Sequence, residues 1–194
     1  HAMSRRQRQM CIRDRICYSL MMSLKVPTRF RNKKSVLFKK RSIIEYAGNR
    51  SNRVYYVVKG LLRSYHLDDK GKIHTFMFAP EDWIIGDVES IALGNQNALY
   101  IDCLEDSEVI VSQEINPVSN STILKEKNNK LLRRVGMLQQ RVIMLMSYTA
   151  RERYEFFLKT YPTLPNRVSQ KMIASYLGIT PEALSKIRRE MVII

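Results

Sequence analysis

The sequence has no run of eighteen apolar residues, few cysteines and few histidines, and each shortage excludes a class of protein. A membrane-spanning helix needs about 20 predominantly apolar residues, so we expect no membrane span. The three cysteines (Cys11, Cys17 and Cys103) are odd in number and scattered, which is typical of a reducing cytoplasm and not of a disulfide framework. There is no His-x-His, P-loop, nucleophile elbow or zinc motif, so the sequence predicts no enzyme and identifies no metal or cofactor.

Positive charge is what the sequence has in excess, and most of it lies toward the C-terminus. The 194 residues include 33 Lys and Arg against 18 Asp and Glu, a net charge of +15. Residues 25–118 contribute only +2, whereas residues 119–149 contribute +5 and residues 150–194 contribute +4. Since 45% of the residues are hydrophobic, the chain is of the globular class. The basic C-terminal third therefore predicts a polyanionic partner there.

The sequence divides into four segments. Residues 1–24 receive no function, because His1-Ala2-Met3 resembles a cloning scar and the arginine-rich run after it matches no structural pattern. We expect a β-roll over 25–118, a dimerisation helix over 119–148 and a helix-turn-helix domain over 149–194. The predicted fold class is α+β.

Short β-type runs separated by turns fill the predicted roll. Val54–Val58 is rich in valine and tyrosine and is followed by Lys59-Gly60. The acidic, glycine-containing turn Asp68–Gly71 precedes another β-type run, Ile73–Phe78, which predicts a hairpin. Many short strands with frequent turns are typical of a sandwich or a roll.

A heptad pattern begins after Asn116-Pro117, where the apolar period becomes helical. Leucine occupies every d position, while the a positions hold two β-branched valines and one asparagine, a combination that favours parallel two-stranded coils. The predicted dimer seam consists of Leu124, Asn128, Leu131, Val135, Leu138, Val142 and Leu145. The alternative is a helix that packs only on its own roll. We favour a seam combined with a second apolar face (Met137, Ile143, Met144, Met146) that contacts the roll.

A helix start lies inside this otherwise helical stretch. Thr149-Ala150-Arg151-Glu152 is a capping box, in which the threonine accepts from the third helical amide and the glutamate reaches back. A new helix therefore begins here, with a hinge around 147–149. Prolines at 162 and 165 end it.

Residues 170–189 carry the most specific pattern in the chain. Ser169 can cap a helix over 170–177, and Gly178 supplies the left-handed residue at its end. Thr180-Pro181 caps a second helix over 182–189. Two helices joined by a three- to four-residue turn with glycine form a helix-turn-helix. Ala174 is small where the helices cross, and the inner apolar face consists of Ile173, Leu177, Ile179, Leu184 and Ile187.

The outer face of the second helix carries side chains of the types that reach bases and phosphates. It holds Glu182, Ser185, Lys186 and Arg189, and the amides beside Thr180 suit a phosphate. The alternative, a helical hairpin that mediates protein contacts only, does not explain the basic C-terminal third.

The order of roll, long helix, break and helix-turn-helix resembles the Crp/Fnr superfamily of bacterial regulators from Pro27 onward. The similar stretches are Val54 to Gly60, Asp69-Lys70-Gly71, Pro80-Glu81-Asp82, Trp83 to Asp87 and residues 168–189. The resemblance implies a roll of the cyclic-nucleotide-binding type and a cytoplasmic transcription regulator whose partners are DNA, a second copy of the chain and RNA polymerase.

The resemblance also assigns the DNA contacts. Ser169, Gln170 and Thr180 would hold phosphates, with Lys171 beside them. The residues facing the major groove would be Pro181, Glu182, Ser185, Lys186 and Arg189, and the glutamate could accept from a cytosine amino group. The chain ends soon after Arg189, so we expect either a branch without the β-hairpin wing of winged variants or a truncated sequence.

The expected effector pocket departs from the cyclic-AMP pattern. Its residues would be Gly86, Asp87, Ser90, Asn97 and Ala98. Asp87 stands where cyclic-nucleotide-binding members have glutamate, and Asn97 stands where they have the arginine that grips the phosphate. We therefore expect no cyclic AMP binding, and three scattered cysteines do not suit an iron–sulfur cluster. The roll is expected either to work without an effector or to bind an unknown small molecule.

A metal enzyme on a cupin-type roll is the remaining alternative. Such a site needs a cluster of two histidines and a carboxylate on adjacent strands. His66 and His74 are the only histidines in the roll, where lone histidines on strands are mostly structural. They are also the only candidates for a haem ligand. The sequence favours the regulator.

Overall fold

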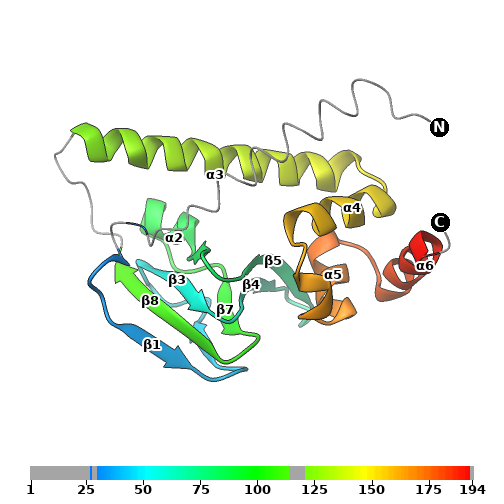
Figure 1. Cartoon of the computed structure of the whole chain (residues 1–194), viewed down its shortest axis with the longest axis horizontal. Coiled ribbons are helices and arrows are strands. Elements are labelled where there is room, and N and C mark those ends of the chain that lie inside the picture. The colour runs from blue at the N-terminus through cyan, green and yellow to red at the C-terminus, as the bar shows by residue number, and fades with distance from the viewer. Residues whose placement is uncertain (1–26, 28–29, 114–120, 193–194) are drawn as a thin grey trace.

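The computed structural model describes residue 27 and residues 30–113 and 121–192, with the strands and one short α-helix first and the other helices last (Figure 1). The strands are β1 Ser35–Phe38, β2 Ile43–Glu45, β3 Arg53–Lys59, β4 Leu62–Leu67, β5 Ile73–Ala79, β6 Ile84–Ile85, β7 Tyr100–Cys103 and β8 Ser107–Gln113. The helices are α2 Val88–Leu93, α3 Ser121–Ser147, α4 Ala150–Thr160, the 3-10 turn Leu164–Asn166, α5 Gln170–Leu177 and α6 Pro181–Val192. The predicted α+β class and the order of roll, long helix and helix-turn-helix are confirmed.

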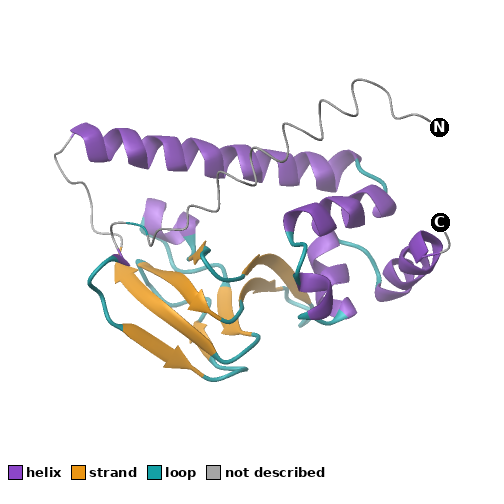
Figure 2. Cartoon of the chain, in the orientation of Figure 1, coloured by secondary structure: helices purple, strands orange, loops and turns teal. Residues whose placement is uncertain are grey.

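The roll consists of two four-stranded antiparallel sheets. Their strand orders are β1-β8-β3-β6 and β2-β7-β4-β5. Side chains on alternate positions of each strand point inward and form the core between the sheets. This core includes Tyr55, Val57, Leu62, Ile101 and Val109. Figure 2 shows the strands on one side of the molecule, with α3 alongside them and α4, α5 and α6 at the far end.

The hairpin between β4 and β5 has the predicted turn. Leu67 pairs with Ile73, and the Asp68 carboxylate accepts hydrogen bonds from the amides of Lys70 (3.0 Å) and Lys72 (2.9 Å). Gly71 has φ +75°, which glycine adopts at little cost. The aspartate and the glycine therefore close this turn together.

The sequence pattern did not predict α2. The helix is only six residues long, from Val88 to Leu93, and is capped at both ends. Asp87 accepts from the amide of Ser90 at its start, and Gly94 adopts the left-handed conformation at its end. A helix this short has too little periodicity to be recognised from apolar spacing.

The break between α3 and α4 lies where the capping box predicts it. Thr149 accepts from the amide of Glu152, and the Glu152 carboxylate accepts from the Thr149 amide at 2.8 Å. Since this cap starts a new helix, α3 ends at Ser147. In the ranges that the structure describes, no helix combines the length and apolar content needed to cross a membrane.

A second core joins the roll to the C-terminal helices. Phe78 from β5 is fully buried against the aromatic rings of Phe157, Tyr161 and Tyr176, with centroid distances between 5.7 and 6.3 Å. Leu61 belongs to the same cluster. The helix-turn-helix therefore shares a hydrophobic core with the roll, a continuity that nothing in the sequence pattern predicts.

Candidate nucleic-acid interface

The first helix of the predicted helix-turn-helix begins and ends where expected. The Ser169 side chain accepts from the amide of Met172 at 3.3 Å and caps α5. Gly178 follows α5 with φ +66°, and its amide donates to the carbonyls of Ala174 and Ser175. Three residues then connect α5 to α6. Both ends of α5 are thus fixed by the residues that the sequence assigned to them.

The second helix starts at Pro181, after Thr180. The Thr180 hydroxyl accepts a hydrogen bond of 3.2 Å from the amide of Ala183, one of the first amides of α6, which have no carbonyl partner within the helix. The helix extends to Val192, beyond the predicted end at 189. Its start is therefore set by the threonine cap and the proline at the first helical position.

The apolar face between the two helices is buried as predicted. Ile173, Ala174, Leu177, Leu184 and Ile187 are all buried. Each belongs to the core that includes Phe78, and Ile179 is packed against it. Because these positions are committed to the interior, the opposite face of α6 is directed outward.

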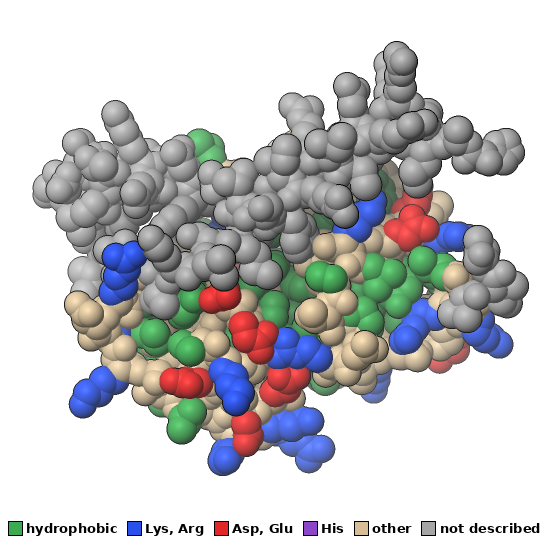
Figure 3. Space-filling view, viewed as in Figure 1, with side chains coloured by type: hydrophobic (Ala, Val, Ile, Leu, Met, Phe, Trp, Pro, Cys, Tyr) green, Lys and Arg blue, Asp and Glu red, His purple; other side chains and the backbone are tan. Residues whose placement is uncertain are grey.

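The predicted DNA-contact residues lie on that outward face and at the adjacent start of α5. Ser169, Gln170, Lys171, Thr180, Glu182, Lys186 and Arg189 are exposed, while Pro181 and Ser185 are half-buried. Figure 3 shows Lys and Arg side chains at the end of the molecule where α6 lies. On α6, residues 182, 185, 186 and 189 are spaced three or four apart, which puts them on one face of the helix.

Charge on this face is mixed, with one carboxylate beside the basic residues. Hydrogen bonds from its own backbone amide, and then from Thr180, lower the pKa of Glu182 below its ordinary value. Glu182 is therefore ionised at neutral pH. An ionised carboxylate repels phosphates but accepts well from a cytosine amino group, which fits a base contact better than a backbone contact.

Arg167 holds the helix-turn-helix to the roll. Its guanidinium donates to both carboxylate oxygens of Glu81 (2.8 Å each), to those of Glu105 (2.9 and 2.7 Å) and to the carbonyl of Gly60 (3.1 Å). Burial alone raises the pKa of Glu81, but the hydrogen bonds from Arg167, from its own amide and from Gly60 outweigh burial and lower it overall. Five bonds from one side chain fix the segment that precedes α5.

Ser175 makes a second link between the helices and the roll. Its hydroxyl donates to the carbonyl of Ile73 at 2.7 Å and accepts from the amide of Thr75 at 2.9 Å. β5 is the last strand of its sheet, so these backbone groups lie on an edge. The serine takes the place of a neighbouring strand there, while the outer face of α6 stays exposed.

Part of the predicted dimer seam falls within the described side chains. Val135, Leu138, Val142 and Leu145 are between 38% and 53% exposed, although all are large and apolar. The side chains of Leu124, Asn128 and Leu131 lie outside the described residues. In the part of the chain that the structure describes, these four side chains form an apolar strip at heptad spacing that stays partly exposed.

The second apolar face that we expected to contact the roll is covered at one position. Met144 is fully buried, but Met137, Ile143 and Met146 are 36%, 46% and 80% exposed. The prediction that these three pack on the roll is therefore wrong. The physical reason is that α4 and α5 pack against the end of the roll near the C-terminal end of α3. The apolar stripe of α3 is therefore wider than the part that the described residues cover.

The residues of the expected effector pocket come together and bond to one another. Asp87 accepts from the amides of Ser90 (3.2 Å), Ala98 (2.7 Å) and Leu99 (3.0 Å). Ser90 donates to the Asn97 amide oxygen at 2.8 Å. Asp87, Ser90 and Asn97 are all buried. The polar groups that would hold a ligand are thus used within the chain.

Gly86 serves packing at this position. A Cβ added there would lie 2.9 Å from the carbonyl oxygen of Arg53 and from a methyl of Val54, so the chain just after β6 lies too close to β3 for a side chain. Ala98 is exposed, and its amide is one of the groups bonded to Asp87. The glycine that the resemblance places near a ligand is required here by the approach of two strands.

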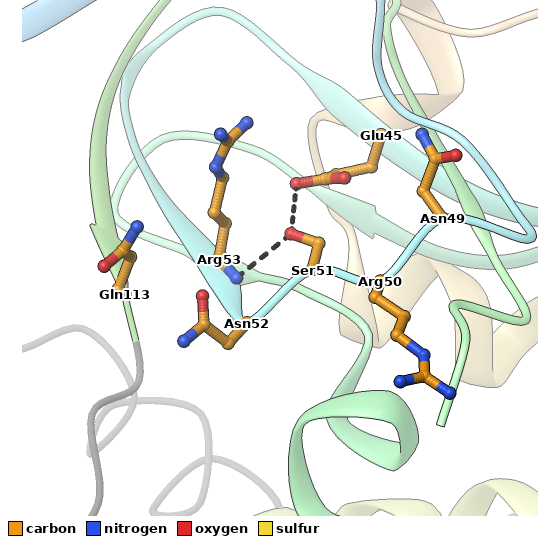
Figure 4. A pocket seen from close by; sticks show the side chains of 7 residues that line it. All are labelled: Glu45, Asn49, Arg50, Ser51, Asn52, Arg53 and Gln113. Atoms are coloured by element: carbon orange, nitrogen blue, oxygen red, sulfur yellow. Dashed lines mark hydrogen bonds between the residues drawn. The ribbon is translucent and has the colours of Figure 1, made fainter. Parts of the chain in front are cut away.

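Glu45 extends the buried network toward the surface. Its carboxylate accepts from Tyr55 (2.6 Å), Ser51 (2.7 Å) and Asn97 (3.4 Å). Figure 4 shows it at a hollow of about 510 Å³, where Arg50 and Arg53 point in different directions. Two guanidiniums that diverge do not form a clamp for one phosphate.

The two histidines of the roll face each other across β4 and β5 but bond elsewhere. His66 lies opposite His74. The Nδ1 atom of His66 is 3.2 Å from the carbonyl of Ala98, and the Nε2 atom of His74 is 2.8 Å from Asp68. Among the described residues, no group of three His, Cys, Asp or Glu side chains is placed to hold a metal ion.

Three arginines with structural contacts had no counterpart in the sequence predictions. Arg141, Arg153 and Arg167 bond to backbone carbonyls or carboxylates of distant segments. In the sequence they are unremarkable basic residues of helices or loops. The bonds from Arg141 to Tyr176, from Arg153 to Leu177 and from Arg167 to Glu81 span 35, 24 and 86 positions, so no local pattern could have identified them.

Comparison with known proteins gives matches of structure but not of sequence. Neither the known family models nor the curated proteins match this sequence. The fold is similar to that of FixK2 from Bradyrhizobium japonicum, with 21% identity, a TM-score of 0.64 and coverage of 82% of this chain and 84% of that one. It is also similar to a CRP/FNR-family transcriptional regulator from Thermus thermophilus (20%, TM-score 0.66, 82% and 86% covered).

A third similar structure extends the match over more of this chain. A CooA variant from Carboxydothermus hydrogenoformans has 18% identity and a TM-score of 0.63, and it covers 90% of this chain and 83% of its own. All three matches span both the roll and the C-terminal helices. What they share with this chain is the fold.

Proposed function

We propose that this chain, whose fold is that of the Crp/Fnr transcription regulators, is itself such a regulator and binds DNA as a homodimer through α5 and α6. The observation that carries the proposal is the surface formed by Gln170, Glu182, Lys186 and Arg189, which is exposed while the opposite face of both helices is buried. A recognition helix needs this division, because its base contacts require an open face on a rigid support.

The exposed strip on α3 supports dimerisation. Val135, Leu138, Val142 and Leu145 repeat at steps of three and four and are partly exposed in the single chain. Pairing two copies along this strip would bury it and would relate the two recognition helices by a two-fold axis. The operator of such a dimer is a near-palindrome whose half-sites lie about 34 Å apart.

The roll in this proposal works without cyclic AMP. Asp87, Ser90 and Asn97 bond to one another, and Asn97 offers no guanidinium for a phosphate. A buried cyclic phosphate would therefore lack a charged partner and would have to displace these bonds. We place RNA polymerase among the partners, as for a regulator acting at promoters.

DNA selection tests the proposal directly. The full chain is incubated with a random duplex pool, and the selected sequences are compared with scrambled ones by fluorescence anisotropy at physiological salt. We expect selected DNA to bind at least about 1,000-fold more tightly than scrambled DNA. Equal binding of the two would overturn the proposal, and the roll would then be the part to test for a ligand-binding function.

Two substitutions connect DNA binding to the candidate surface. The double variant Lys186→Ala/Arg189→Ala should lose about 100-fold or more in affinity while remaining dimeric, because each base or phosphate contact contributes about 1–3 kcal/mol. Lys159→Ala is the matched control, since Lys159 is exposed on α4, which contributes no residue to this surface. Unchanged binding of the double variant would favour a helix-turn-helix that contacts proteins only.

A further inference from the structure

The C-terminal end of α5 is bonded to arginines from two other helices. The carbonyl of Tyr176 accepts from Arg141 of α3, and the carbonyl of Leu177 accepts from Arg153 of α4, both at 3.1 Å. The last carbonyls of a helix have no partner within the helix and carry the negative end of its dipole. Two guanidiniums therefore meet α5 where cations are most favourable.

Arg153 also binds the end of the long helix. Its Nε donates to the carbonyl of Tyr148 at 3.0 Å, and its Nη2 donates to the carbonyl of Leu145 at 2.9 Å. One planar group thus joins the C-terminal ends of α3 and α5 by three bonds. The rigid fork of a guanidinium can reach three fixed carbonyls at once, which the ammonium of a lysine cannot do with the same geometry.

Arg141 makes the same connection from the side of α3. Its guanidinium carbon lies 3.8 Å from the centre of the Tyr176 ring, and its Nη2 also donates to the carbonyl of Thr75 at 3.4 Å. Stacking on an aromatic face adds to the hydrogen bond. The side chain therefore contacts the helix-turn-helix and the roll from the helix that carries the dimer seam.

The position of α5 determines that of α6. Only three residues separate the helices, and the amide of Ile179 in this turn donates to Ala174 at 3.1 Å. Leu184 and Ile187 of α6 are buried in the core that α5 shares. Whatever fixes the end of α5 relative to α3 consequently fixes the recognition helix relative to the dimer axis.

We propose that Arg141 and Arg153 are positioning residues that set the distance and angle between the two recognition helices, and thereby the half-site spacing that the dimer accepts. The proposal rests on the DNA-binding function proposed above. Neither arginine lies on the DNA-contact surface. They affect the half-site spacing and not the base contacts themselves, because they connect α3, which carries the dimer seam, to the helix-turn-helix.

Operators of altered spacing test this role. From the DNA selected by the wild-type chain, three palindromes are made with the same half-sites and with spacers that are native, one base pair longer and one base pair shorter. One base pair moves a half-site by about 3.4 Å and rotates it by about 35°. We expect the wild type to prefer the native spacer by about tenfold or more, and Arg141→Lys/Arg153→Lys to prefer it by less than about threefold.

Matched variants separate spacing from stability. Arg151→Ala removes an arginine from α4 that forms an exposed ion pair with Glu155 at 3.2 Å, and it should keep the wild-type preference. Lysine is used at positions 141 and 153 in place of alanine because it keeps both charges and much of the packing, so that the variant loses less stability than one with alanine there. If the lysine variants are folded and dimeric and keep the tenfold preference, the proposal is overturned.

A measurement without DNA distinguishes this proposal from the proposed function. Spin labels are placed by Lys186→Cys in a background with Cys11→Ser and Cys17→Ser, and the distance across the dimer is measured by electron paramagnetic resonance. The distance distribution should broaden or shift in Arg141→Lys/Arg153→Lys. An unchanged distribution contradicts the positioning role, whereas a wild-type chain that selects no DNA contradicts the DNA-binding function.

Discussion

The hydroxyl of Ser185 donates a hydrogen bond of 3.0 Å to the side-chain amide oxygen of Gln170. Gln170 is the first residue of α5, and Ser185 lies on the outward face of α6. The bond therefore connects the two parts of the candidate surface, one proposed for phosphate contact and the other for base contact. Because the bond fixes the amide oxygen of Gln170, it also fixes the direction of the two N–H donors on the same amide group.

Removing this bond should weaken DNA binding but not the fold. Ser185→Ala and Gln170→Ala should each lower the affinity for selected DNA by about five- to tenfold, with a coupling of about 1 kcal/mol between them. Anisotropy titrations of the two single variants and the double variant measure this coupling. Thr163→Ala, at an exposed position outside α5 and α6, should bind normally. Strictly additive effects would mean that the bond does not organise the surface.

A charge on the seam should separate the dimer. Val142→Asp places a carboxylate at an a position that is 53% exposed in the single chain and would be buried on pairing. We expect the dimer dissociation constant to rise by about 100-fold, or about 2.7 kcal/mol, in sedimentation experiments. Gln140→Asp is the control, because residue 140 is exposed at an outer position of the same helix. Equal effects of the two would argue against this seam.

Asp87 should prove to be structural. Its buried carboxylate accepts from the three amides of Ser90, Ala98 and Leu99. Asp87→Ala leaves these donors without their acceptor and should lower the free energy of unfolding by about 3 kcal/mol in urea titrations. Glu89→Ala, exposed on the same helix, should change it by less than about 0.5 kcal/mol. A loss of effector response without a loss of stability would instead indicate a ligand contact.

The Arg167–Glu81 contact should make stability depend on pH in the acid range. The pKa of Glu81 is lower in the folded chain than in the unfolded one, where it is near 4.5. Its contribution is therefore present above that value and is lost as the pH falls through the lower, folded pKa. Arg167→Ala should cost about 2 kcal/mol at pH 7, and the difference from wild type should shrink below about pH 4. If the stability difference between wild type and Arg167→Ala does not depend on pH, the bond to Glu81 does not account for the stabilising effect of Arg167.

Cyclic AMP should not bind, and restoring one arginine should not change this. Asn97 is 4% exposed and accepts from Ser90, so Asn97→Arg places a guanidinium in a filled site beside Glu45. An arginine there pairs with the buried carboxylate more readily than with a ligand phosphate. Isothermal titration with cyclic AMP should give no heat for either protein. Micromolar binding by Asn97→Arg would show that the lost arginine is the sole obstacle.

The sequence by itself determined the elements whose causes are local. The capping box at Thr149, the caps at Ser169 and Thr180 and the left-handed Gly178 act within four residues of themselves, and the structure has each of them. The inner face of the helix-turn-helix follows from helical spacing in the same way. The outer face, with its exposed basic residues, consists of the positions that this spacing does not assign to the buried face.

Only the tertiary structure decided what the long helix, the pocket and the arginines do. Met146 has the same apolar character as Met144, yet one is 80% exposed and the other is buried, because burial depends on which distant element lies opposite. The expected pocket is closed by Glu45, which reaches Asn97 from 52 positions away. Arg141 and Arg153 acquire their role from carbonyls on a helix 24 to 35 residues further along the chain. Such contacts are absent from local spacing, since folding alone brings these groups within hydrogen-bond distance.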